Sequence, residues 1–223
     1  MVVKGKTILI KADLHVHTEY SKLDCNTKLE EIIAACKVAG IGCVAIADHG
    51  TVEGALKLQA MNPPFKVIVA EEVLTPHGEI MGMFLTKTVP SHQPVDAVVA
   101  QIRAQGGLIC IPHPFDRLRP SGLAAREIER IAGQIDIIEC YNSKVMVVSS
   151  LKNARAFADK HGKAKGAGSD AHVPQNIGSA YVEIRDFNTK EEFLAALKQG
   201  NVVGRRTLPY RSIWQRIKKL FIR

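Results

Sequence analysis

The chain has 223 residues, of which 46% are apolar and 23% charged, enough for one large domain with a full hydrophobic core. No run approaches the roughly 18 apolar residues of a membrane span, and MVVKGKTILIKADLH leads into charged residues, so we expect a cytoplasmic protein without a signal peptide. The net charge is +8, and the five scattered cysteines form no CxxC pair, which argues against a disulfide framework or a thiolate zinc site.

Short apolar runs rich in β-branched residues alternate with helical patterns along the chain. In order, the segments are TILIKADLH, LEEIIAACKVAG, GCVAIADH, VEGALKLQAM, FKVIVAEEV, GEIMGMFL, PVDAVVAQIRAQG, LICIPHP, IDIIEC, SLKNARAFADKHG and AKGAGSDAH. Asn26 or Thr27 is expected to cap the first helix, and Gly40 to end it. The alternation predicts repeated βα units around a parallel sheet, either a barrel or an open doubly wound sheet.

Polar residues cluster where the predicted strands end. The positions are Asp13, His15 and His17 on the first strand, Asp48 and His49 on the second, Glu71 and Glu72 on the third, His113 after LICI, and Asp170 and His172 after AKGAG. Because the carboxyl ends of parallel strands meet at one face, where the active sites of such folds lie, we expect these side chains to converge.

Imidazole and carboxylate groups are the ligands that zinc, manganese and iron accept in proteins. The pair His15 and His17 has the His-x-His spacing that places two imidazoles on the same face of an extended strand. A single histidine at a strand end is more often structural than a metal ligand, but five such positions beside acidic residues favour a metal centre.

These motifs resemble those of the PHP (polymerase and histidinol phosphatase) superfamily. The matching segments are ADLHVHTEYS, ADHGT, the acidic end of VIVAEEVLT, IPHPF and GAGSDAH, within roughly residues 8–200. The resemblance implies an α/β fold, a distorted seven-stranded (β/α) barrel with two or three divalent ions (Mn, Zn or Fe) at the carboxyl ends of the strands.

The resemblance also implies a set of ligands. His15, His17, Glu72 and Asp170 would hold one ion, with Glu72 bridging to a neighbour. A second ion would be held by His49 and His172 with Asp24, and His113 would join Glu72 at a third. Asp13 and Asp48 would orient the adjacent imidazoles through their other ring nitrogen.

Two positions depart from the family pattern. Met81 stands where many members have a histidine, so the third site would be weak, empty or completed by Glu79 or His77. Lys22 stands where many members have an acid, which makes Asp24 the substitute.

The metals would activate a water and neutralise the phosphoryl oxygens, so that no protein nucleophile is required. We assign catalytic roles to Asp170, His172, Arg117 and Asn142; Arg117 or Arg119 would hold phosphate oxygens, with Lys144 as another candidate. Gly168 is expected to permit a close backbone approach beneath a metal ligand.

The last 19 residues differ from the rest of the chain. Seven basic side chains and no acidic ones lie within 205–223. We therefore predict a domain at 1–204 and a basic amphipathic tail at 205–223, docked on the barrel or in contact with an anionic membrane surface or a nucleic acid.

The predicted function is metal-dependent hydrolysis of a phosphate ester, which would be a nucleotide, the end of an oligonucleotide or a small phosphomonoester. The alternatives are a histidinol-phosphate phosphatase and a metal-binding protein of this fold without catalysis.

Overall fold

The structure is a computed structural model that describes residues 8–21 and 24–207. Lys22 and nearly all of the predicted basic tail lie outside the described residues, so the division at residue 204 stays a prediction. None of the helices in the described ranges is long and apolar enough to span a bilayer.

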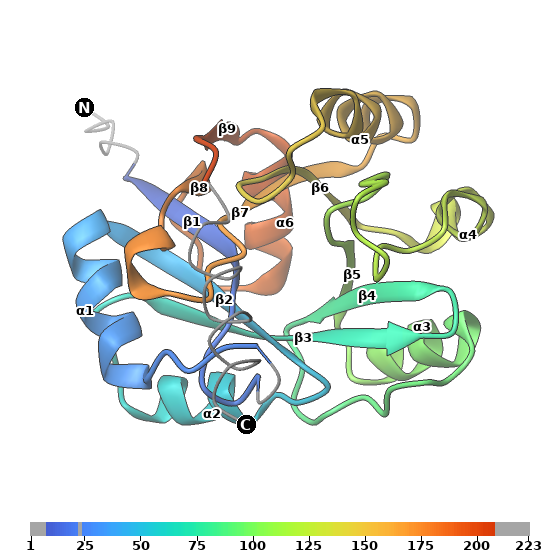
Figure 1. Ribbon diagram of the computed structural model, residues 1–223. Coiled ribbons are helices and arrows are strands. Elements are labelled where there is room, and N and C mark those ends of the chain that lie inside the picture. Colours follow the sequence, from blue (N-terminus) through green and yellow to red (C-terminus); the bar gives the residue numbers. More distant parts are fainter. Residues whose placement is uncertain (1–7, 22–23, 208–223) are drawn as a thin grey trace, which may run out of the picture.

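A nine-stranded sheet forms the centre of the molecule, with helices around it (Figure 1). The strands are β1 (Leu9–Val16), β2 (Ile41–His49), β3 (Lys66–Thr75), β4 (Gly78–Met83), β5 (Leu108–Ile111), β6 (Ile137–Asn142), β7 (Ala164–Gly168), β8 (Ala180–Arg185) and β9 (Asn201–Gly204). The α-helices are α1 (Leu29–Ala39), α2 (Glu53–Ala60), α3 (Val95–Ala104), α4 (Ala125–Arg130), α5 (Val148–Lys160) and α6 (Lys190–Lys198). Two short 3₁₀ segments are η1 (Ala132–Gln134) and η2 (Pro174–Asn176).

The predicted distorted barrel is confirmed, although the sheet has nine strands where the family resemblance implied seven. Strands β1 to β7 follow one another in sequence order across the sheet, and a bridge between Val16 of β1 and Ala171, just after β7, joins the first and the seventh of them. Strand β4 runs antiparallel to both neighbours, and β8 and β9 extend the sheet beyond β1 by antiparallel pairing. Strands β1, β2, β3, β5, β6 and β7 therefore point their carboxyl ends to one side.

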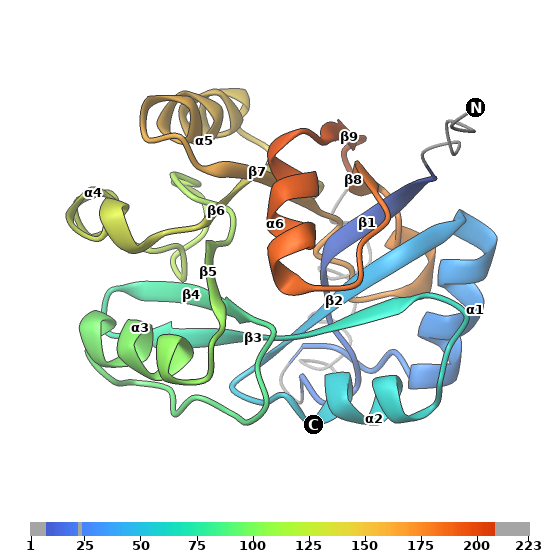
Figure 2. The same ribbon diagram turned by 180° about the vertical axis from the view of Figure 1, so that it is seen from behind.

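Two apolar clusters hold the sheet in place. The outer cluster lies between the strands and the surrounding helices and contains Ile46, Val98 and Phe157. The inner cluster fills the other face of the sheet, where α6 contributes the fully buried Phe193 (Figure 2). Because the predicted elements end at residue 172, this closure by α6 was not expected from the sequence.

The first helix begins differently from the prediction. Its N-cap is Lys28, whose backbone N–H donates to Glu31, so neither Asn26 nor Thr27 caps it. The hydroxyl of Thr27 donates instead to the carbonyl of His172, across the mouth of the barrel. Gly40 ends the helix in the left-handed conformation at φ 66°, as predicted.

Candidate metal centre

An irregularity in β1 turns two histidines toward the inside of the barrel. Ala12 and Leu14 belong to the inner cluster, and the pairing of β1 with β2 shifts register between Asp13 and Val16. This shift carries His15 and His17 to the inner side at the strand end, with 3.1 Å between their Nε2 atoms. Gly168 lies directly against His15, where a Cβ atom would overlap the Cβ of that histidine, so the predicted close approach is confirmed.

Glu72 lies at the middle of the cluster. One of its oxygens, Oε2, is 3.4 Å from His15 Nε2, 3.5 Å from His17 Nε2 and 3.3 Å from His49 Nδ1. The other, Oε1, is 2.8 Å from His113 Nε2. Oε2 is buried and accepts no hydrogen bond from any residue that the structure describes. A buried carboxylate oxygen without a donor is costly unless a cation occupies the space before it.

Strand β4 adds a second carboxylate to the cluster. Glu79 lies 3.7 Å from His49 Nδ1 and 3.5 Å from His113 Nε2. Met81, two residues further on and paired with Glu72 across the strands, packs in the inner cluster beneath it. His77 is exposed in the turn before β4, so of the two proposed substitutes only Glu79 reaches the cluster.

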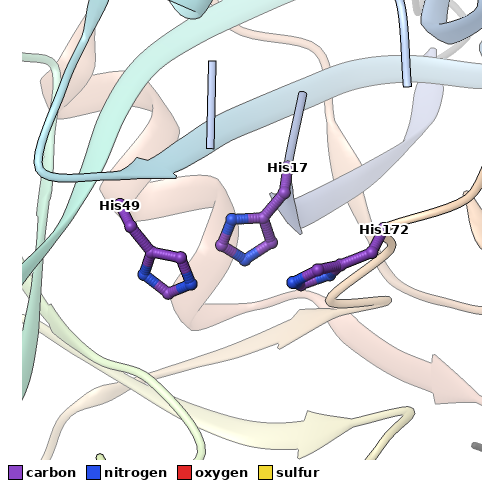
Figure 3. Close-up of side chains that lie close together, drawn as sticks. All are labelled: His17, His49 and His172. Atoms are coloured by element: carbon purple, nitrogen blue, oxygen red, sulfur yellow. The ribbon is translucent and has the colours of Figure 1, made fainter. Parts of the chain in front are cut away.

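The loop after β7 and the loop after β1 complete the ring. Asp170 Oδ1 is 3.4 Å from His17 Nε2, and His172 Nε2 is 2.9 Å from Asp24 Oδ2, which is also 3.3 Å from His49 Nε2. Figure 3 shows His17, His49 and His172 turned toward one another from three separate segments of the chain. The structure thus brings together all eight residues that the family resemblance implied as metal ligands.

A carboxylate that the sequence analysis assigned no role orients two of these ligands. Glu139 Oε1 is 3.0 Å from His15 Nδ1, and its Oε2 accepts hydrogen bonds from the backbone N–H of His113 at 2.6 Å and from Asn142 Nδ2 at 3.0 Å. When Nδ1 of His15 donates to Glu139, Nε2 is left as the ring nitrogen able to bind a metal. Glu139 lies two residues after Ile137, which belongs to the inner cluster, so the alternation of a strand places both side chains on the inner face of β6. This alternation was the sequence signal that could have identified Glu139.

Asn142 is completely buried and joins two carboxylates, since its Nδ2 also lies 3.2 Å from Asp170 Oδ2. This position does not agree with direct contact between Asn142 and a substrate. The residue instead connects the orienting carboxylate of Glu139 to the predicted ligand Asp170.

The prediction that Asp13 and Asp48 orient the adjacent imidazoles is wrong. Asp13 accepts backbone N–H groups from Ser169 and Gly178, both at 2.9 Å, and so ties the loop after β7 to β1. Asp48 accepts the backbone N–H and the hydroxyl of Thr18, both at 2.7 Å. The ring contact at Nδ1 of His17 is made by Ser21 Oγ at 3.1 Å.

Two cations reach the cluster. Arg119 Nη1 is 2.7 Å from Asp170 Oδ2, and Lys144 Nζ is 3.0 Å from Asp170 Oδ1 and 2.7 Å from His172 Nδ1. Arg117, to which the sequence analysis gives a catalytic role, is exposed and lines a cavity that contains no residue of the cluster. Of the two arginines, Arg119 is the one that the fold places at the cluster.

The charges perturb one another strongly. Burial raises the pKa of Asp170, but Arg119 and Lys144 outweigh burial and hold it well below its usual value. Burial likewise raises the pKa of Glu72, and here His15 and His113 outweigh it and lower the pKa. Glu79 is different: burial, together with repulsion from Glu72, raises its pKa to about 7. The cluster therefore contains more carboxylates than its own cations neutralise.

The donor set fits divalent cations. Three groups have ligand atoms within 4.8 Å of one another: His15, His17 and Asp170; His17, His49 and His172; and His49, Glu72 and Glu79. The first matches three of the four ligands implied for the first ion, while the third places Glu79 where the resemblance implied His113. Positive φ angles at His113 (31°) and Asp170 (51°) show backbone strain at two cluster residues, a common feature of functional sites.

Comparisons with known proteins agree with this geometry. The sequence model of the PHP domain matches residues 13–100, and a second model, described as PHP-associated, matches residues 149–202. The chain is 32% identical over 201 residues to an uncharacterized protein of Methanocaldococcus jannaschii, covering 85% of this chain and 79% of that one. It is 40% identical over 73 residues to DNA polymerase III subunit alpha of Campylobacter jejuni, covering 30% of this chain and 6% of the polymerase. The chain belongs to the PHP domain family.

Solved structures share the fold at low sequence identity. One is a two-domain protein of Bacteroides vulgatus containing a predicted PHP-like metal-dependent phosphoesterase, with a TM-score of 0.69, 14% identity and coverage of 89% of this chain and 65% of that one. Another is PsfC from Pseudomonas syringae, with a TM-score of 0.66, 13% identity and coverage of 96% and 99%. The chain thus spans slightly less than two thirds of the first of these proteins.

Proposed function

We propose that the protein is a metal-dependent hydrolase of phosphate esters. The observation that carries the proposal is the buried Oε2 of Glu72, which faces three imidazoles and has no donor among the described residues. Family membership adds to this, because the similar Bacteroides vulgatus protein is described as containing a predicted PHP-like metal-dependent phosphoesterase.

Divalent ions would be held by the side chains of the cluster, namely His15, His17, Asp24, His49, Glu72, Glu79, His113, Asp170 and His172. When bound, such ions supply an activated water and neutralise charge on the phosphoryl group. Manganese, zinc and iron all suit these imidazole and carboxylate ligands.

Arg119 and Lys144 would position the phosphoryl group. Each contacts a different oxygen of Asp170, so a phosphate that approaches this carboxylate meets a cation on either side. The guanidinium of Arg119 can donate two parallel hydrogen bonds to phosphate oxygens.

A serine nucleophile is not required. The hydroxyl of Ser169 donates to the carbonyl of His15 at 3.3 Å, which keeps this side chain engaged with the backbone. Ser21 Oγ is buried between His17 Nδ1 and the backbone N–H of His49.

The substrate would be a nucleotide, the end of an oligonucleotide or a small phosphomonoester. The similarity to a DNA polymerase subunit over 73 residues favours the nucleotide classes. The alternatives are a histidinol-phosphate phosphatase and a protein that binds metal without catalysis. Turnover on histidinol phosphate beside short oligonucleotides separates the two enzymatic readings.

The test uses the full chain with 4-nitrophenyl phosphate and bis(4-nitrophenyl) phosphate, with and without Mn²⁺. We expect metal-dependent hydrolysis of at least one ester, which Glu72→Gln abolishes. Glu71→Gln is the matched control, because the neighbouring carboxylate is also buried but points away from the cluster and accepts the backbone N–H of Val89. Bound metal without hydrolysis of either ester or of the natural candidates would contradict catalysis.

A further inference from the structure

A cavity of about 400 Å³ is formed in part by the loop that also carries the cluster residues His113 and Arg119. It is formed by the loop between β5 and α4, by the start of α4 and by α5, and includes Phe115, Asp116, Arg117, Ala125 and Asn153. Its volume falls within the range of sites that bind small molecules, roughly 300–1,000 Å³.

One loop lines both the cavity and the metal centre. His113 and Arg119 reach the cluster, whereas Phe115 and Arg117 line the cavity. Two residues of chain span at most about 7 Å, so each cavity residue lies close to a cluster residue. The far end of the loop is also attached to the centre, because Ser121 accepts the backbone N–H of Glu79 at 2.8 Å.

The walls of the cavity combine an aromatic ring with a cation. The ring of Phe115 packs 5.8 Å from that of Phe157 on α5, in tilted geometry, and its backbone has a φ of 62°. Arg117 forms no ion pair with any residue in the described ranges, whereas Arg119 and Arg126 both do. An exposed guanidinium without a counter-charge attracts an anion.

Asp116 also lines the cavity, but it is much less accessible than Arg117. Its side chain is nearly buried, and Oδ1 accepts the backbone N–H of Leu118 at 3.2 Å, which holds the loop in its turn. The charge most accessible to a ligand in the cavity is therefore that of Arg117, and Asn153 adds an uncharged hydrogen-bonding group.

We propose that this cavity binds the leaving group of the phosphate ester, and that Arg117 pairs with a second anionic group carried by that leaving group. Phe115 contacts its apolar part, while Arg119 contacts the phosphate that reacts. The substrate class becomes a phosphate ester whose leaving group bears a carboxylate or a further phosphate. This inference rests on the proposed function.

The test measures binding rather than turnover, with phosphonates that cannot be hydrolysed. Benzylphosphonate, 4-carboxybenzylphosphonate and 1,4-xylylenediphosphonate are titrated calorimetrically into the Mn²⁺-loaded full chain. We expect the second anionic group to raise affinity about fivefold, corresponding to an exposed ion pair of about 1 kcal/mol. Comparison of the two probes that carry a second anionic group shows whether a carboxylate or a phosphate is preferred.

Arg117→Gln should bring the ratio of affinities, between probes with two anionic groups and the probe with one, to about one. Arg126→Gln is the matched control, since this arginine lies on α4 beside the cavity but is exposed and ion-paired with Glu127, and it should keep the ratio. Equal binding of all three probes, or an unchanged affinity ratio in Arg117→Gln, would overturn this inference but leave the proposed function standing. Failure of every phosphonate to bind the metal-loaded protein would overturn the proposed function as well.

Discussion

His15, His17 and Asp170 are almost completely buried, whereas the side chains of His49 and Asp24, across the same cluster, are 30% and 33% exposed. The buried half is oriented by protein groups, since Glu139 and Asn142 hold His15 and Asp170. The exposed half consists mainly of ligands that contact one another. The two halves should therefore bind metal with unequal strength. Of the four predictions that follow, the first two test metal affinity directly, and the other two concern the protonation of the cluster and the attachment of the exposed half.

The largest effect is expected when a buried ligand is removed. Asp170→Asn should lower the affinity for the tightest ion by more than about 100-fold, above the usual range for orienting residues. It also leaves Arg119 and Lys144 facing the site without their carboxylate. Asp24→Asn, in the exposed half, should cost less than about 10-fold. Competition with a chelator measures both, and equal losses would show that the halves are not distinct.

Glu139→Gln should lower metal affinity by about 10- to 100-fold while all metal ligands remain. An amide has one acceptor oxygen and cannot accept from both His15 Nδ1 and the backbone N–H of His113. Glu71→Gln controls for loss of a buried carboxylate, because burial raises the pKa of Glu71 to about 7, so a neutral group fits there. Similar losses in both variants would remove the special role of Glu139.

The metal-free protein should become less stable as the pH rises from about 4.5 to 7. Burial and repulsion from Glu72 raise the folded-state pKa of Glu79 to about 7, and burial raises that of Glu71 to about 7 and that of Asp13 to about 6, so these three carboxyl groups hold more protons in the folded protein than in the unfolded chain over this interval. They outnumber His17 and His113, whose lowered pKa values act in the opposite direction, so stability should fall as the pH rises. Saturating Mn²⁺ should oppose this loss, because the ion favours the ionised carboxylate. Thermal melting between pH 4.5 and 8, with and without metal, checks this, and a melting temperature of the metal-free protein that rises over the interval would contradict it.

The smallest effect concerns the attachment of the exposed half. Thr27→Val removes the 3.1 Å hydrogen bond from the hydroxyl to the carbonyl of His172 and should cost about 1 kcal/mol of unfolding free energy. That corresponds to about 2–4 °C in melting temperature for a domain of this size. Thr86→Val, whose hydroxyl contacts Gln105 at the surface, is the control. An unchanged melting temperature for Thr27→Val would show that this contact does not hold His172.

Most of the ligand set could be predicted because its positions depend on local rules. The side chains of a strand alternate, and parallel strands end on one side, so His49 and Glu72, which follow the inward-facing Ala47 and Ala70, had to meet once the βα rhythm was recognised. His15 and His113 lie at the same end of the sheet, but they turn inward only through the register shift of β1 and the positive φ at His113. The family resemblance supplied the division into ions, and Asp24 as a substitute.

The βα order and the end of the sheet where the ligands gather followed from the sequence, because they depend on hydrophobic period and chain direction. The choice of a barrel over an open doubly wound sheet came from the family resemblance. Only the tertiary structure decided that Arg119 and not Arg117 reaches Asp170, that Glu139 orients His15, and that α6 fills the inside of the sheet. Those outcomes depend on the path of a loop and on contacts between residues far apart in the chain, which no local pattern encodes.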